Sequence, residues 1–325
     1  MQLTRRALGL ATLGAAATLA RPGILRAAEP LNMGYVPVNA IHWIGNVLVE
    51  KGFLKEKGFE VQPSLFQSAP QAIQQLIGGG YQVASTQPEP LVAAVEHGAA
   101  IGAFTAPANT PDWTLNAGPD IKSLADLKGK TIGISALNSS EVWLTNALLE
   151  KAGLRKGEFN FITSGTSPLK VTALERGAIA AAILFQPTAE LARRQGFPPI
   201  AKYAGLRNYP SIVYCMSRDW AGKGDNGPRV SRAFTKGQEW LWDPDNKAEA
   251  IAILAKYTKR EPDICLAVYE QFFVTDKLYS KHGEIDMAGF AEALAAMTTE
   301  TDIIKPPAPP ATKFVLEKNL GGILG

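Results

Sequence analysis

The sequence predicts an α/β protein in which one set of alternating strands and helices is followed by a second set. Short apolar runs alternate with helical patterns from Leu31 to about residue 105, and a comparable series runs from about residue 130 to Tyr203. Such alternation is typical of mostly parallel sheets covered by helices. Beyond Asp219 the apolar residues recur at helical spacing, so the chain is expected to continue in helices.

The first series contains four expected strands and three expected helices. Glycines follow two of these helices, at Gly52 and at 78–80, where glycine is a typical helix stop. The expected strands cover 31–36, 60–66, 83–84 and 100–105, and the expected helices cover 43–51, 71–77 and 89–96.

The second series has the same character, and a helical region follows it. Its expected strands cover 130–135, 159–163, 178–185 and 199–203, and its helices cover 140–152, 168–176 and 187–195. Further helices are expected at 229–242, 247–256, 262–272 and 286–297. The proline-rich segment 306–310 reads as a stiff linker to a short helix at 311–319.

The first 27 residues resemble a removable export signal. Arg5 and Arg6 precede an apolar run of 14 residues at 7–20, and the small residues Ala27 and Ala28 follow it. The arginine pair indicates the twin-arginine route, with the general secretory route as the alternative. A membrane anchor fits less well, because a spanning helix needs about 20 apolar residues. We therefore expect cleavage near Ala27 and a periplasmic mature protein.

Charge and metal-ligating residues exclude several classes of function. The chain has 33 basic and 30 acidic residues, and removing the four arginines of segment 1–27 leaves 29 against 30. No basic patch of the kind that binds nucleic acid is expected. His42, His97 and His282 lie in unrelated segments, so neither a metal site nor a cofactor is expected. Cys215 and Cys265 are either two buried thiols or one disulfide, which export would permit.

Four motifs then occur in a characteristic order. They are EKGFLKEKGFEV at 50–61, LADLKGKTIG at 124–133, LLEKAGL at 148–154 and ALERG at 173–177. This set resembles the nitrate/sulfonate/taurine-type solute-binding proteins of ABC importers, a family that also includes binders of thiamine's pyrimidine precursors. The family usually has an acidic residue where this chain has Tyr81-Gln82, and this departure leaves the ligand class open.

The resemblance implies a two-lobed periplasmic binding protein of the type II-like clamshell class. Lobe 1 is expected to hold 28–114 plus 206–325 and lobe 2 to hold 115–205, with hinges near 110–117 and 203–210. The implied function is capture of a small organic or anionic ligand, such as a sulfonate, taurine, nitrate, pyrimidine or aromatic compound. The protein would deliver it, as a monomer and without catalysis, to a permease and ATPase complex.

Ligands of open α/β sheets bind beyond the carboxyl ends of the strands. Hydroxyl and amide side chains recur at those places in this sequence, near helix starts whose free N–H groups can hold an anion. Helix capping explains any one of them, but their recurrence favours a ligand site. The expected ligand-binding residues are Asn39, His42, Trp43, Gln67, Ser68, Ser85, Thr86, Glu89, Ser135, Asn138, Ser139, Ser140, Glu141, Thr166, Ser167 and Gln186.

The charge of the ligand stays open at this point. These segments contain no lysine or arginine, so Arg207 near a predicted hinge is the basic candidate. Glu89 and Glu141 would favour an amine if they faced the cleft, and Trp43 could stack on a flat ligand. An exported enzyme acting on a small heterocycle is one alternative, although no Gly-x-Ser-x-Gly elbow occurs in the chain. A periplasmic ligand sensor is the other.

Overall fold

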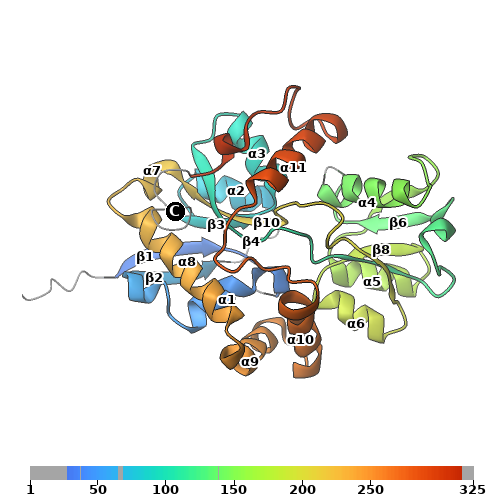
Figure 1. Ribbon diagram of the computed structural model, residues 1–325, viewed down its shortest axis with the longest axis horizontal. Helices are drawn as coiled ribbons and strands as arrows, with labels where there is room; N and C mark the ends of the chain where they lie inside the picture. Colours follow the sequence, from blue (N-terminus) through green and yellow to red (C-terminus); the bar gives the residue numbers. More distant parts are fainter. Residues whose placement is uncertain (1–27, 37, 65–68, 138, 317–325) are drawn as a thin grey trace, which may run out of the picture.

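The computed structural model describes residues 28–36, 38–64, 69–137 and 139–316, and it places two five-stranded sheets side by side along the long axis (Figure 1). The predicted signal peptide lies outside the described residues. So do three of the expected ligand-binding residues, Gln67, Ser68 and Asn138.

The first sheet belongs to the first lobe. It consists, in spatial order, of β2 (Phe59–Ser64), β1 (Glu29–Gly34), β3 (Val83–Thr86), β10 (Ile212–Ser217) and β4 (Ile101–Ala108). Strands β1, β2 and β3 pair in parallel, and β10 is antiparallel to both of its neighbours.

The second sheet has the same arrangement. It consists of β7 (Asn160–Thr163), β6 (Thr131–Ile134), β8 (Ala181–Leu184), β5 (Thr114–Ala117) and β9 (Pro199–Lys202). Here β5 is the antiparallel strand, paired with β8 and β9. The predicted mostly parallel sheets are therefore confirmed, and each contains one antiparallel strand that follows a crossing between the lobes. The sequence analysis expected β5 only as part of a hinge.

Helices cover the sheets of both lobes. In the first lobe they are α1 (Trp43–Glu50), α2 (Ala69–Ile77) and α3 (Pro88–Glu96), with the short helices η1 (Ala40–His42) and η2 (Lys55–Lys57). In the second lobe they are η3 (Leu124–Leu127), α4 (Ser140–Lys151), α5 (Ser167–Glu175) and α6 (Thr188–Arg194).

The C-terminal part is helical, as predicted, and several of its helices pack against elements of the first sheet and its helices. Its helices are α7 (Arg218–Ala221), α8 (Asn226–Trp242), η4 (Pro244–Asn246), α9 (Lys247–Thr258), α10 (Pro262–Tyr269), the π-helix η5 (Glu270–Thr275) and α11 (Met287–Glu300). Figure 1 shows α10 beside α6 on one side of the molecule and α11 near α4 on the other, so helices of this part border both edges of the second lobe. The helix expected at 311–319 is a short 3-10 turn, η6 (Ala311–Phe314), and residues beyond 316 are not among those described.

Two glycines explain why the first motif has its spacing. Gly52 ends the turn after α1 with φ +67°, and Gly58 follows η2 with φ +82°. Residues that carry a Cβ atom rarely adopt this left-handed backbone conformation, whereas glycine adopts it without steric cost. The turn returns the chain to the sheet, where Phe59 begins β2 and is fully buried.

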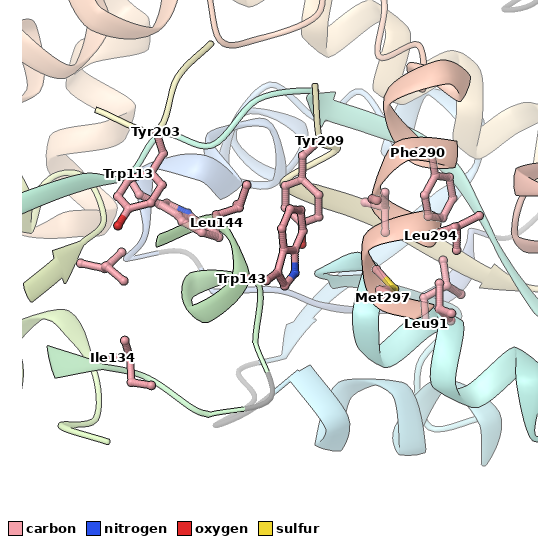
Figure 2. Close-up of a cluster of buried hydrophobic side chains, with 14 of the residues drawn as sticks. Leu91, Trp113, Ile134, Trp143, Leu144, Tyr203, Tyr209, Phe290, Leu294 and Met297 are labelled. Carbon is pink, nitrogen blue, oxygen red and sulfur yellow. The ribbon is translucent and has the colours of Figure 1, made fainter. Parts of the chain in front are cut away.

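The two crossings between the lobes run next to each other. Tyr203 N donates to Trp113 O (3.1 Å), Tyr209 N to Asn109 O (3.0 Å) and Ser211 N to Ala108 O (3.1 Å). Figure 2 shows Trp113, Tyr203 and Tyr209 among buried side chains of both lobes, with Trp143 beside Tyr209. The two crossings therefore form a paired ribbon covered by an apolar cluster.

Two smaller observations complete the fold. Within the part of the chain that the structure describes, no helix is both long and apolar enough to cross a bilayer. Cys215 and Cys265 are both buried and both free, which decides between the two alternatives left open by the sequence.

Candidate functional site

A cavity of about 370 Å³ lies between the lobes, within the size range of small-molecule sites. A ligand in it would touch both lobes at once. The first lobe contributes Val36, Val38, Asn39, Thr258 and Arg260, and the second contributes Ser135, Thr166, Ser167, Pro168, Phe185, Gln186, Pro187 and Thr188. Five of the expected ligand-binding residues therefore line it, namely Asn39, Ser135, Thr166, Ser167 and Gln186.

The strand ends bring these residues together. Ser135 directly follows β6, and Phe185 and Gln186 follow β8, which is parallel to β6 in the same sheet. Helix α5 begins at the cavity with Thr166 as its N-cap residue. The Ser167 hydroxyl accepts a hydrogen bond from Phe185 N (3.1 Å), which ties the start of α5 to the end of β8. Pro168 has no N–H, so the backbone N–H groups that this helix start can offer to an anion are those of Ser167 and Leu169.

Arg260 is a site residue that the sequence analysis missed. Among the described residues that line the cavity, it is the one with an ionisable side chain, and no ion pair joins it to any described carboxylate. It follows the C-terminal end of α9, where Lys259 has φ +52° and ends the helix. The Lys259-Arg260-Glu261-Pro262 stretch indicates a helix stop in the sequence, but nothing in that signal places the turn opposite the second lobe. The cavity thus has a cationic side chain and no facing acid in the described part of the chain.

Glu141 lies behind the cavity instead of lining it. Its carboxylate accepts hydrogen bonds from Ser135 N (2.7 Å), Ser135 Oγ (2.6 Å) and Lys170 Nζ (2.9 Å). Lys170 also donates to Ile183 O on β8 (2.9 Å), and burial lowers the pKa of its ammonium group. The Lys170 and Glu141 side chains are 0% and 2% exposed. The pair fixes two of the loops that carry cavity residues, and it leaves Glu141 no free charge with which to attract an amine.

Glu89 is engaged in the same way, at the junction of the lobes. It is 4% exposed and accepts hydrogen bonds from Tyr209 OH (3.0 and 2.8 Å) and, more weakly, from Trp143 Nε1 on α4 (3.4 Å). Ser140 lies next to it, and burial raises the pKa of the Glu89 carboxyl. These hydrogen bonds therefore join the first lobe to the second crossing and to the second lobe. They also occupy the oxygen atoms of the carboxylate, which was expected to contact a ligand.

Trp43 and His42 are core residues. Trp43 is fully buried, packs against Tyr269 and Phe273, and donates from Nε1 to Ala250 O (3.1 Å). It is enclosed by the C-terminal helices and does not line the cavity. His42 is 5% exposed, and burial lowers the pKa of its imidazole to about 3, so the ring is neutral at physiological pH.

The remaining expected residues lie around the cavity or away from it. Ser85 and Thr86, at the end of β3, are 0% and 1% exposed, and their hydroxyl groups have no partner within the described part of the chain. Ser139 donates its hydroxyl to Ala136 O (2.6 Å). Arg207 borders a different cavity of about 330 Å³ between α4 and α11, so it is not the cation of the site described above.

A third buried carboxyl, that of Asp112, lies next to Gln186 of the cavity. Asp112, in the first crossing, is fully buried, and its Oδ2 accepts from Gln186 N (3.3 Å) while Oδ1 has no partner among the described residues. Burial raises the pKa of this carboxyl to about 7. No group of three or more His, Cys, Asp or Glu side chains in the described ranges could hold a metal ion.

Solved structures with the same fold include binding proteins from several bacteria. The alkanesulfonate-binding protein SsuA from Xanthomonas axonopodis pv. citri, bound to MOPS, is 18% identical (TM-score 0.72, covering 89% of this chain and 99% of that one). The periplasmic aliphatic sulphonate binding protein SsuA from Escherichia coli is 22% identical (TM-score 0.71, covering 88% and 97%). A mutant of DszB in complex with biphenyl-2-sulfinic acid is 14% identical (TM-score 0.66, covering 91% and 99%). At these identities the likeness establishes the fold, and the predicted two-lobed architecture is confirmed.

A search of curated protein sequences finds no match. The family comparison, by contrast, matches the description "NMT1/THI5 like" over residues 44–247, which is more than half of the chain and includes all four motifs. The resemblance drawn from those motifs is confirmed, and the chain belongs to the NMT1/THI5-like family.

Proposed function

We propose that this protein captures a small organic anion in the interlobe cavity and, after export to the periplasm, delivers it to the permease of an ABC importer. The observation that carries the proposal is Arg260, a cation without an ion-pair partner in the described chain, facing a cavity whose opposite wall contains the start of α5. A guanidinium group and a helix N-terminus both favour a carboxylate, sulfonate or phosphate group.

The rest of the cavity suits an organic ligand with a compact apolar part. Val36, Val38, Phe185 and Pro187 contribute apolar surface, while Asn39 and Thr166 add polar groups. Two related structures are named for binding alkanesulfonates and aliphatic sulphonates, which makes a sulfonate the first class to test. Contacts to both lobes would favour the closed conformation, and the closed surface is what a permease would recognise.

The test is a binding screen with matched arginine variants. Nitrate, ethanesulfonate, butanesulfonate, benzenesulfonate, benzoate and putrescine would be compared by thermal shift and then by calorimetry. We expect an organic anion to stabilise the protein and Arg260→Gln to weaken its binding about 10- to 100-fold, as loss of a charge-assisted hydrogen bond predicts. Arg207→Gln, in the other cavity, is the control and should leave binding unchanged.

Two results would contradict the proposal. One is stabilisation by putrescine and by none of the anions. The other is equal loss of affinity in both arginine variants. Mass spectrometry of the bound compound after prolonged incubation tests the enzyme alternative, because a binding protein returns its ligand chemically unchanged. Export is checked separately by fractionating cells that express the full chain.

A further inference from the structure

We propose that Gln186 is a clasp between the lobes, a positioning residue that holds the cavity closed and does not itself bind the ligand. The role of this clasp in ligand binding rests on the proposed function, but its hydrogen bonds do not depend on which ligand binds. Gln186 follows β8, lines the interlobe cavity and is 7% exposed.

Two hydrogen bonds join Gln186 to the first lobe. Its carbonyl oxygen accepts from Ala40 N (3.0 Å), at the start of η1, and its side-chain Nε2 donates to Gln271 Oε1 (2.7 Å). Ala40 and Gln271 belong to distant parts of the sequence that both pack in the first lobe. One residue of the second lobe is thereby attached to the first lobe at two separate points.

The other polar atoms of Gln186 are used within the protein. Its Oε1 accepts from Glu190 N (3.2 Å) at the first turn of α6, and its backbone N donates to Asp112 Oδ2 (3.3 Å). Each polar atom of the residue therefore already has a protein partner. The side chain is held in one orientation by α6 and presents its Nε2 to Gln271, which is the arrangement expected of a clasp.

The partner residue lies in an unusual element. Gln271 belongs to η5, a π-helical segment that continues α10, and such segments are rare and frequent at functional sites. Exposed ion pairs occur along the same seam between the lobes, Arg194 with Asp263 and Lys202 with Asp276. Exposed ion pairs contribute little free energy. The amide pair of Gln186 and Gln271 is less exposed than these ion pairs, so we expect it to contribute more than they do to holding the lobes together along this seam.

The test changes the partner, because Gln271 does not line the cavity that holds Gln186 and Arg260. Gln271→Leu removes the acceptor at similar size, and Gln271→Glu keeps an acceptor for Nε2. Spin labels on exposed Lys223→Cys in the first lobe and Arg176→Cys in the second would report the interlobe distance by pulsed EPR, without added ligand. The two native thiols are buried and should stay unlabelled.

We expect the ratio of closed to open protein to fall about fivefold in Gln271→Leu and to stay near the wild-type value in Gln271→Glu. Fivefold corresponds to a hydrogen bond of about 1 kcal/mol. Lys202→Met, which breaks an exposed ion pair of the same seam, is the control and should change the ratio less than about twofold. If butanesulfonate binds, its affinity should fall most in Gln271→Leu and should change little in Gln271→Glu and Lys202→Met.

Identical distance distributions in the wild type and Gln271→Leu would overturn the clasp, and so would equal losses in Gln271→Leu and Gln271→Glu. Because this measurement needs no ligand, it separates the two proposals. A lower closed fraction in Gln271→Leu supports the clasp even if every compound in the binding screen fails.

Discussion

Removing one partner of the buried Lys170–Glu141 pair should destabilise the protein far more than removing both. Lys170→Met leaves the Glu141 carboxylate, 2% exposed, with only the two donors of Ser135 and no compensating charge. An uncompensated buried charge of this kind costs about 3–5 kcal/mol. Glu141→Gln should be similarly costly, because it leaves the Lys170 ammonium group buried without its counterion.

The double variant Lys170→Met/Glu141→Gln should lie within about 2 kcal/mol of the wild type, because a neutral glutamine can still accept from Ser135 and no charge remains buried. Free energies of unfolding from urea titrations give the four corners of a double-mutant cycle. The exposed pair Lys128–Glu158, with side chains 68% and 31% exposed, is the control and should show no measurable coupling in the same cycle.

Either of two results would refute this reasoning. One is a loss well below the expected range in both single variants, which would mean that water reaches the pair. The other is a double variant whose loss equals the sum of the two single losses, which would mean that the charges do not act on each other.

Two further predictions concern single buried groups. Trp43→Ala should destabilise the protein by about 3–5 kcal/mol in urea titrations while leaving the ligand affinity of the folded protein unchanged by calorimetry, because Trp43 is core; selective loss of affinity would contradict that placement. The Asp112 carboxyl has its pKa raised to about 7, so the folded state holds its proton more tightly than the unfolded chain. The wild type should therefore lose stability relative to Asp112→Asn as pH rises from about 4 to 7, by roughly 4 kcal/mol in total, and a difference independent of pH would refute it.

The alternation of apolar runs was sufficient to predict the two sheets and their covering helices, because strands and helices each bury a face at their own period. It also predicted, to within two residues, where β1, β6 and β8 end, and the segments after these ends carry Asn39, Ser135 and Gln186 to the cavity. The prediction succeeded there because the direction of parallel strands fixes which edge of a sheet their carboxyl ends share.

Side chains whose surroundings come from distant segments could not be predicted. Arg260 reaches the cavity only because the C-terminal helices fold back onto the first lobe. Glu141 forms an ion pair with Lys170 of the next helix, α5. Trp43 donates a hydrogen bond to Ala250 O of α9, 207 residues later in the chain. For Glu141 and Trp43 the local pattern allowed a ligand contact, and tertiary packing placed both side chains away from the cavity.

The pairing of the two crossings restricts how the lobes can move. Three backbone hydrogen bonds fasten one crossing to the other, from Ala108–Ser211 to Trp113–Tyr203. A two-stranded ribbon bends easily across its flat face and resists bending within its plane. The two lobes should therefore rotate about a single axis that lies at the paired crossings. A solute would then enter and leave the cavity on the side opposite these crossings.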